Sequence, residues 1–262
     1  FFSVGQGESS LLTFPDGKRM LIDGGGSYRE VALDPGKMVL APALWRRGIH
    51  RLDYMVLSHP HPDHLKGLVF LAEAFSIGEF WESGVNDGGD DYQRLKRVLS
   101  EKGVKVRRID SSTGAINIGS ALVEPLAPDI LHESDADLND SSLVLNLRFE
   151  GVAILFTGDI GSDAEERLLA DPLSLRCTIL KVAHHGSRSS SSEAFLDAAS
   201  PQCLLISVGH DNRFRLPSPE TLRRLRRRGA RVYRTDEHGT ITVTIEGGNW
   251  RVHTFREGGH FN

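Results

Sequence analysis

The fold is decided by one stretch of sequence, His59-Pro60-His61-Pro62-Asp63-His64, which follows the apolar segment 52–57. We expect segment 52–57 to form a buried strand ending at Ser58, so that side chains of the next turn can converge on one point. Neutral imidazole suits zinc, manganese and iron, and the Asp63 carboxylate supports a second, harder cation site beside the first. A histidine-rich surface turn is the alternative, but composition alone would give this pattern in only about one in a thousand chains of this length. The stretch therefore predicts a metal centre at a strand end.

Two further apolar segments end in residues that can bind metal. Segment 154–158 leads to Asp159, and a carboxylate at a strand end can bridge two cations. Segment 180–183 leads to His184 and His185. Taken alone, Asp159 is better explained as the N-cap of the helix expected at 163–170, and the two histidines equally well as buried strand-end residues. The cluster at 59–64 favours metal binding for both segments.

Strands and helices alternate along the chain. Strands are expected near 9–14, 19–23, 52–57, 78–81, 104–109, 121–126, 142–149, 152–157, 178–182, 203–208, 231–234, 240–245 and 249–255, and helices near 37–47, 65–75, 91–102, 163–170, 193–199 and 219–228. This alternation favours mixed sheets covered by helices, an α/β fold. Polar loops are expected at 87–91 and 134–140. No repeat of fixed period interrupts the chain, and we treat residues 1–262 as one domain.

Composition excludes several classes of protein. The 262 residues carry 31 basic and 35 acidic side chains, so a formal net charge of −4 excludes a histone-like polyanion binder. Two cysteines cannot form a disulfide framework or a four-thiolate zinc site. No apolar run approaches 18 residues, and the opening residues are neither a signal peptide nor begin with Met. We expect a soluble piece of a longer protein or a processed product.

Two segments could hold phosphate groups. Ser187 and Arg188 precede the helix expected at 193–199, where backbone N–H groups and the helix dipole favour an anion, although a flexible serine loop is an equal alternative. Segment 219–228 carries five arginines, among them Arg223 and Arg227. Such a run is more often a solvated helix face, but it can also contact a phosphate backbone. Because no aromatic ladder is interleaved with these arginines, any DNA contact is expected to be independent of base sequence.

The motifs together resemble the metallo-β-lactamase superfamily. The cluster at 59–64, Thr157-Gly158-Asp159 and Leu21-Ile22-Asp23-Gly24-Gly25 carry the resemblance. More narrowly, the chain resembles the hydrolase domain of the ComEC family of competence DNA-uptake proteins. That likeness rests on segments 4–8, 58–60, 139–145, 155–159, 180–187 and 206–212, in matching order over nearly the whole chain.

The resemblance implies an αββα sandwich with two divalent ions, manganese or zinc, at one edge of the sheets. Carried over by position, His59 and His61 would bind the first ion. Asp63 and His64 would bind the second, and Asp159 would bridge the two ions. His185, in preference to His184, would complete the second site, and Asp23 would orient a ligating imidazole. Asn212, in the last matching segment, is included with Ser187, Arg188, Arg223 and Arg227 among the expected phosphate contacts.

Two positions depart from the family pattern. Between the cluster and Asp159 the only histidine is His132, and the chain has Asn139-Asp140 where a third ligand of the first site is usual, so that Asp140 is a substitute candidate. Leu216 stands where the family commonly has a histidine, unless His210 or His238 compensates. Both departures bear on how efficiently the enzyme turns over.

A pair of divalent cations can activate water for in-line attack on phosphorus. We therefore expect metal-dependent hydrolysis of DNA phosphodiesters, with Asp63 and His185 in catalytic roles and Asp63 accepting the proton of the attacking water. The alternatives are hydrolysis of a small ester, thioester or lactam, and a DNA-binding module without turnover. The ComEC resemblance implies a soluble domain of a polytopic membrane protein, which degrades the strand not taken up on the outer side of the cytoplasmic membrane.

Overall fold

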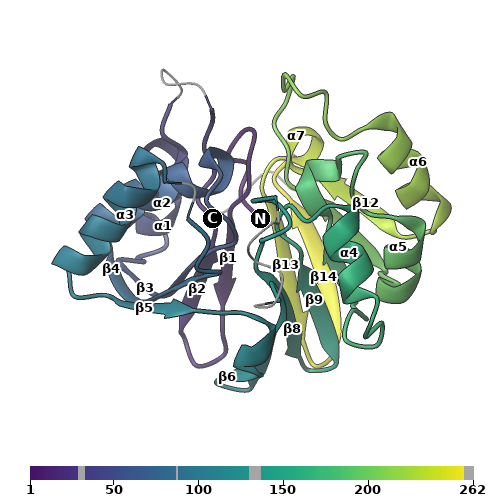
Figure 1. Ribbon diagram of the computed structural model, residues 1–262, viewed down its shortest axis with the longest axis horizontal. Helices are drawn as coiled ribbons and strands as arrows, with labels where there is room; N and C mark the ends of the chain where they lie inside the picture. The colour runs from purple at the N-terminus through teal and green to yellow at the C-terminus, as the bar shows by residue number, and fades with distance from the viewer. Residues whose placement is uncertain (29–32, 87, 130–136, 257–262) are drawn as a thin grey trace.

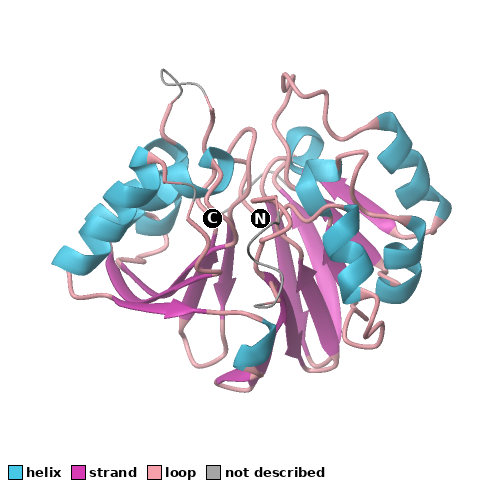
Figure 2. Cartoon of the chain, viewed as in Figure 1, coloured by secondary structure: helices cyan, strands magenta, loops and turns pink. Residues whose placement is uncertain are grey.

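The computed structural model describes residues 1–28, 33–86, 88–129 and 137–256. Two β-sheets face each other in the middle of the molecule, and helices cover the outer face of each sheet (Figures 1 and 2). This four-layer arrangement confirms the expected αββα sandwich. Among the described residues, no helix combines the length and the apolar character needed to cross a membrane.

The first sheet is built mainly from parallel strands. In spatial order it contains β1 (Ser10–Thr13), β2 (Arg19–Ile22), β3 (Arg51–Leu57), β4 (Ser76–Glu82) and β5 (Lys105–Arg108). Only the pairing of β1 with β2 is antiparallel. Its outer face is covered by α1 (Ala41–Trp45), α2 (Pro62–Ala74) and α3 (Asp90–Glu101) (Figure 1).

The second sheet is half parallel and half antiparallel. In spatial order it contains β12 (Arg231–Arg234), β11 (Cys203–Ile206), β10 (Ile179–Lys181), β9 (Val152–Phe156), β8 (Val144–Phe149), β7 (Ala121–Ala127) and β6 (Ile116–Ile118). Strands β9 to β12 are parallel, and β6 to β9 are antiparallel. It is covered by α4 (Ser162–Leu168), α5 (Glu193–Ala199) and α6 (Pro219–Arg227), and a separate hairpin pairs β13 (Ile241–Glu246) with β14 (Asn249–Thr254).

Three apolar cores lie between the four layers. Successive side chains of a strand point to opposite faces, so each central strand contributes to two cores. In β2, Met20 and Ile22 join the core between the sheets, whereas Leu21 packs with residues of α2 and α3. In β11, Leu205 joins the central core and Leu204 the core beneath α5. Strands buried on both faces are apolar throughout, which is why segments 52–57 and 203–208 stand out in the sequence.

The parallel strands place four strand ends at one edge of the sandwich. Asp23 follows β2, the 59–64 cluster follows β3, Asp159 follows β9, and His184 with His185 follows β10. Strands β2 and β3 are parallel neighbours in one sheet, and β9 and β10 in the other. The carboxyl ends of parallel neighbours lie at the same edge, so these residues can meet across the gap between the sheets.

Most predicted elements are present within a few residues of their expected bounds. The helix expected at 37–47 begins as a π-helical segment, η1 (Gly36–Leu40), and continues as α1. Pro42 has no N–H group to donate, which accounts for a change of hydrogen-bond register here. The sequence did not indicate β6, the 3-10 turn η2 (Ser111–Thr113) or the short helix α7 (Thr235–His238). Much of the loop expected at 134–140 lies outside the described residues, and α3 begins inside the loop expected at 87–91.

Helix α2 lies against backbone without intervening side chains, and this contact sets the position of the histidine cluster. A Cβ atom on Gly67 would lie 2.0 Å from the carbonyl oxygen of Gly24, and one on Gly36 would lie 2.2 Å from that of Gly67. Gly67 N–H donates to the carbonyl oxygen of Gly25 at 3.1 Å. Asp63 and His64 belong to the first turn of α2, so this close approach positions them.

We predict that Gly67→Ala lowers the free energy of unfolding by about 2–3 kcal/mol, because the added methyl group must push α2 away from backbone atoms. Urea unfolding followed by circular dichroism measures this change. Ser100→Ala, at an exposed position of α3, is the control and should stay within about 0.5 kcal/mol of the parent. Equal stabilities of the two variants would contradict the packing argument.

Candidate metal centre

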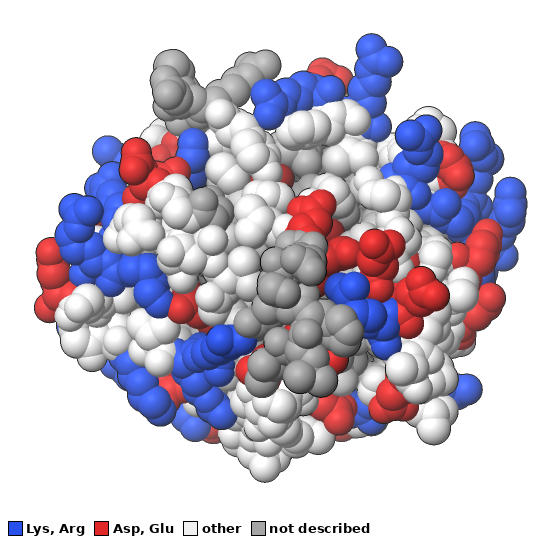
Figure 3. Space-filling model, in the orientation of Figure 1, with Lys and Arg blue, Asp and Glu red and all other residues white. Residues whose placement is uncertain are grey.

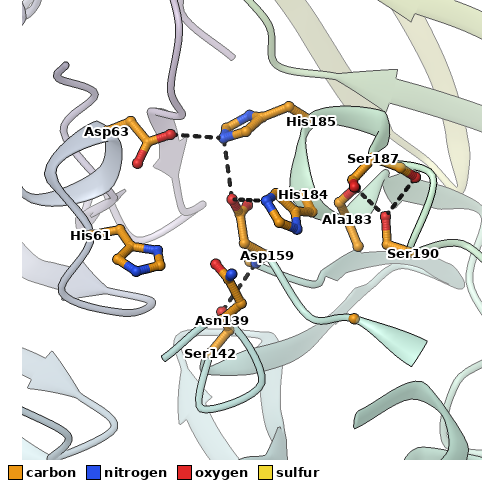
Figure 4. Close-up of polar contacts among 12 residues, drawn as sticks. His61, Asp63, Asn139, Ser142, Asp159, Ala183, His184, His185, Ser187 and Ser190 are labelled. Atoms are coloured by element: carbon orange, nitrogen blue, oxygen red, sulfur yellow. Dashed lines mark hydrogen bonds and ion pairs between the residues drawn. The ribbon is translucent and has the colours of Figure 1, made fainter. Parts of the chain in front are cut away.

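Four buried side chains converge at the shared edge of the two sheets. Potential ligand atoms of Asp63, His64, Asp159 and His185 all lie within 4.8 Å of one another. The Nε2 atom of His185 is 3.3 Å from Oδ2 of Asp63 and 3.2 Å from Oδ2 of Asp159 (Figure 4). The Nε2 atom of His64 is 3.3 Å from the same oxygen of Asp159. We call these residues the four-residue cluster.

Both imidazoles of the cluster are oriented through their other nitrogen. Nδ1 of His64 is 2.7 Å from Oδ2 of Asp23, and Nδ1 of His185 is 2.7 Å from the carbonyl oxygen of Ser207. In the neutral imidazole, an oxygen acceptor at Nδ1 places the proton there and leaves the Nε2 lone pair facing the cluster. Asp23 also accepts hydrogen bonds from the backbone N–H and the hydroxyl of Ser58, which fix its carboxylate. Its place is that of a residue that orients a ligand.

The cluster has the properties expected of a cation site. Among the described residues, Nε2 of His64, Nε2 of His185, Oδ1 of Asp63 and Oδ1 of Asp159 are buried without a hydrogen-bond partner. Buried polar atoms are normally paired, and these four are of the type that binds divalent metal ions. The residues present therefore fit a divalent cation.

His59 and His61 lie beside the cluster as a pair. Nε2 of His59 is 3.0 Å from Nδ1 of His61, and the His59 ring centroid is 4.3 Å from that of His64. His59 is buried and His61 half-buried. These two imidazoles could face a second cation, but they do not belong to the group of ligand atoms within 4.8 Å. His132, the only further histidine before Asp159, lies outside the described residues.

The structure brings His185 into the cluster and leaves His184 at its edge. His185 is 1% exposed, whereas the His184 side chain is 29% exposed and its Nε2 is 3.9 Å from Asp159. Both residues have left-handed backbone conformations, with φ of 53° and 49°, which aim their rings in different directions. Which of the two binds metal stays a prediction, and the geometry favours His185.

Asp140 accepts a hydrogen bond from the backbone near the site. Its Oδ1 accepts a hydrogen bond of 2.7 Å from Gly161 N–H, and its Oδ2 is 4.0 Å from Arg167. It is not part of the four-residue cluster. The neighbouring Asn139 instead has a buried Oδ1 without a hydrogen-bond partner.

A buried lysine, not anticipated from the sequence, holds Asp159 in place. The Lys181 side chain is fully buried, forms an ion pair with the buried Glu8 and donates a 2.8 Å hydrogen bond to the carbonyl oxygen of Gly158. Its Nζ is 3.6 Å from Oδ1 of Asp159. Burial alone would lower the pKa of Lys181, but the charges of Glu8 and Asp159 raise it, so the amine is protonated. The sequence feature that could have indicated this role is the presence of a lysine in an otherwise apolar strand.

The electrostatics of the cluster favour bound protons when no metal is present. Burial alone would lower the pKa of His64, but Asp159 and Asp23 raise it well above its usual value. Burial likewise opposes the charge on His185, yet Asp159 and Asp63 raise its pKa to about 9. Burial and the neighbouring His64 hold the pKa of His59 well below its usual value. A metal ion must therefore compete with protons at His64 and His185.

The residues expected to contact phosphate differ in their exposure to solvent and in the contacts that they make. Arg188 and Arg223 are exposed, and Ser187 Oγ lies 3.1 Å from Ser189 Oγ. Arg227 is also exposed and lies 3.7 Å from Glu193. Asn212 uses its amide within its own loop: Nδ2 donates to the carbonyl oxygens of residues 209 and 216, and Oδ1 accepts from the N–H of residue 216. Asn212 therefore holds the 209–216 loop and is not available for phosphate.

Helix α6 has both structural and exposed arginines. Arg224 donates to the carbonyl oxygen of Ser190 at 2.8 Å, and Arg228 forms ion pairs with Glu193 and Asp197. These contacts tie α6 to α5 and to the serine loop, a role that sequence alone did not suggest. Basic side chains nevertheless gather on the surface over α6 in Figure 3.

No histidine among the described residues takes the place of Leu216. The His210 side chain is 71% exposed and lies next to Asp211, and Nδ1 of His238 contacts the backbone of Arg234.

Tyr28 interacts with a residue of the four-residue cluster, which the sequence did not indicate. Burial and the charges of Asp63 and Asp159 raise the Tyr28 pKa, with a hydrogen bond to Asp63 contributing.

We predict that Lys181→Met destabilises the metal-free protein by about 3–5 kcal/mol, because it leaves Glu8 as an unpaired buried charge. The double variant with Glu8→Gln should regain most of this loss. Lys105→Met is the matched control: its Nζ lies 2.8 Å from Glu79 but its side chain is 68% exposed, so the cost should be about 0–1 kcal/mol. Urea unfolding measures all three, and a Lys181→Met cost no larger than that of the control would refute the role assigned to Lys181.

We also predict that a fixed concentration of manganese raises Tm more at pH 9 than at pH 6.5. The raised pKa values of His64 and His185 stabilise the metal-free fold at pH values below 6.5, the pKa of histidine in the unfolded chain. This stabilisation is lost as the pH rises through about 9. The same deprotonation frees the Nε2 atoms for metal. Thermal unfolding with and without manganese across this range measures the difference, and a shift that stays constant or shrinks with pH would count against the assignment.

The chain is similar to several known proteins. The metallo-beta-lactamase superfamily model matches residues 3–210. ComE operon protein 3 of Bacillus subtilis (strain 168) is 30% identical over 268 residues, covering 96% of this chain and 33% of that protein. Competence protein ComA of Neisseria gonorrhoeae is 27% identical, covering 97% of this chain and 35% of that protein. The chain thus spans about a third of the length of these relatives.

Solved structures share the fold at low sequence identity. The metallo-beta-lactamase fold protein YhfI of Bacillus subtilis superposes with a TM-score of 0.58 at 12% identity, covering 91% of this chain and 96% of that one. A metallo hydrolase of Ignicoccus hospitalis gives a TM-score of 0.53 at 14% identity, covering 97% of this chain and 98% of that one. With a family model matched over most of its length and the expected sandwich in place, the chain belongs to the metallo-β-lactamase superfamily.

Proposed function

We propose that this protein is a metal-dependent hydrolase that cleaves phosphodiester bonds of DNA. The observation that carries the proposal is the four-residue cluster, in which each residue offers a potential ligand atom within 4.8 Å of the others and contributes one buried nitrogen or oxygen atom without a hydrogen-bond partner. Similarity to competence proteins over nearly the whole chain supports DNA as the substrate. Two ions, manganese or zinc, are proposed, one in the cluster and one facing His59 and His61.

Each residue has a proposed task. Bound divalent ions would supply charge to neutralise phosphoryl oxygens and would lower the pKa of a water molecule. Asp63 accepts the proton of the attacking water, because its buried carboxylate lies within the cluster and its Oδ1 has no hydrogen-bond partner. Asp23 and the Ser207 carbonyl keep the two imidazoles aimed at the site. Arg188, exposed on the loop after His185, holds a neighbouring phosphate.

The setting of the domain is also a proposal. Since the competence relatives are about three times longer, we propose that residues 1–262 form one domain of a larger membrane protein, on the outer side of the cytoplasmic membrane. There it would degrade the DNA strand that is not taken up. Exposed arginines on α6 support contact with DNA that does not depend on base sequence.

Hydrolysis of a small ester, thioester or lactam remains the second candidate, because this superfamily fold does not fix the substrate. Such an enzyme needs an enclosed apolar pocket at the metals. An apolar cavity of about 690 Å³ does exist, but it is lined by residues such as Phe14, Phe156 and Ile245 and by no member of the cluster. A DNA-binding module without turnover is the third candidate, and it is favoured because no further histidine of the described residues outside the four-residue cluster joins His59 and His61.

We predict that purified protein stripped of metal degrades plasmid DNA only after manganese or zinc is restored. Asp63→Asn should lower the rate by about a hundredfold or more, since it removes both a metal ligand and the proposed proton acceptor. Asp163→Asn, an exposed carboxylate on α4 outside the cluster, is the control and should leave the rate unchanged. Metal content per chain, measured by mass spectrometry, shows whether each variant still binds its ions.

The other candidates give different results in the same assays. DNA binding without degradation at any metal concentration would identify the binding module. Turnover of a nitrophenyl ester with plasmid left intact would identify the small-ester hydrolase. Either result would contradict the proposed nuclease.

A further inference from the structure

An aromatic surface with an arginine lies at the mouth of the metal centre. The ring centroids of Tyr28 and Phe214 are 6.3 Å apart in an edge arrangement. The guanidinium carbon of Arg213 is 4.6 Å from the Phe214 ring centroid and 5.6 Å from that of Tyr28. Tyr28 is 43% exposed and Phe214 46%, so both rings present faces to solvent. We call these three residues the aromatic mouth.

This surface adjoins the residues proposed to act on phosphate. The Tyr28 ring centroid is 6.0 Å from that of His61, and Tyr28 also interacts with the Asp63 carboxylate. Tyr28 lies in the segment that follows β2, and Phe214 lies in the connection between β11 and α6. They come from opposite sheets, so the aromatic mouth spans the opening between the two halves of the site.

The loop that carries Phe214 is held in shape before any ligand binds. Asn212 closes it through three hydrogen bonds of 2.7–2.9 Å to the backbone of residues 209 and 216. Gly209 N–H donates to the side chain of Gln6 at 3.3 Å, which fixes the loop to the first segment of the chain. An exposed aromatic ring on a fixed loop loses little conformational freedom when it binds a flat ligand. The Phe214 ring is 46% exposed, and the ring contacts recorded for it are with Tyr28 and Arg213 of the same surface.

The local charge favours a polyanion, although the chain as a whole is acidic. Arg213 and Arg215 are both exposed on this loop, and basic side chains lie over the β11 to α6 connection in Figure 3. Aromatic rings that stack bases, combined with arginines that meet the backbone, are the usual means by which proteins bind single-stranded nucleic acid. An apolar protein partner would not require the arginines, and a small ester would not require a surface outside the metal centre.

We propose that the aromatic mouth stacks one unpaired base of single-stranded DNA and so delivers the adjoining phosphate to the metal centre. The proposal deepens the proposed nuclease function and rests on it for the identity of the substrate. Bases in a duplex have both faces covered by their neighbours, so only an unpaired or extruded base can stack on Phe214. The protein should therefore prefer single strands or frayed ends to intact duplex.

The test compares two oligonucleotides with equal charge. One is a fluorescein-labelled thymidine oligomer of about twelve nucleotides, and the other is an abasic oligomer of the same length, both with phosphorothioate linkages that slow hydrolysis. Fluorescence anisotropy with manganese present should give a Kd about tenfold lower for the thymidine oligomer. Phe214→Ala should remove this difference, and Phe214→Trp should keep it. Manganese affinity, measured separately by calorimetry, should be unchanged in both variants.

Phe255→Ala is the matched control, because Phe255 is 55% exposed but lies beside Gly239 and not at the site. It should bind both oligomers as the parent does. Equal affinity of the parent protein for the thymidine and abasic oligomers, with plasmid degradation intact, would overturn the stacking proposal and leave the nuclease function standing. A base-dependent affinity that is lost in Phe214→Ala, with neither plasmid nor an unmodified thymidine oligomer degraded at any metal concentration, would support the stacking surface and contradict the nuclease function.

Discussion

The buried negative charge of Asp159 is the constraint on which the rest of the site depends. A carboxylate removed from water is costly unless charged or hydrogen-bonding groups surround it. Here the partners are Lys181, His64 and His185, at 3.6, 3.3 and 3.2 Å. His64 belongs to the half of the sandwich that contains the first sheet, whereas Lys181 and His185 belong to the second half. Closing the two halves against each other and assembling the site are therefore one event, and a divalent ion would strengthen the same contact.

The architecture explains why the site has a rigid floor and an open mouth. Glycine contacts place α2 directly on the loop after β2, so Asp63 and His64 in its first turn have little freedom to move. The flanking loops reach outward from both sheets and carry exposed aromatic and basic side chains. A phosphate ester with a neighbouring base would place its phosphate at the four-residue cluster and stack its base on the aromatic mouth. The proposed hydrolysis and the proposed preference for unpaired DNA therefore involve adjoining surfaces.

Local patterns predicted which residues come together in the cluster, and contacts between distant segments could not be predicted. The sequence indicates the cluster at 59–64 and the strand ends at Asp159 and His185, because in each case an apolar segment leads into a polar turn. The pairing of Lys181 with Glu8 joins residues far apart in the chain, and nothing local in either segment reveals it. The same holds for Tyr28 and Phe214, which seemed unremarkable until the fold brought them together. In α6, the sequence likewise did not show that Arg224 and Arg228 hold the helix against the serine loop and α5.

We propose that Asp63, His64, Asp159 and His185 surround a divalent ion. A crystal structure of the protein grown with manganese, with diffraction data collected on both sides of the manganese absorption edge, would test this. We expect an anomalous peak between these four side chains, within bonding distance of both Nε2 atoms. Well-ordered density for the four residues with no anomalous peak among them would contradict it.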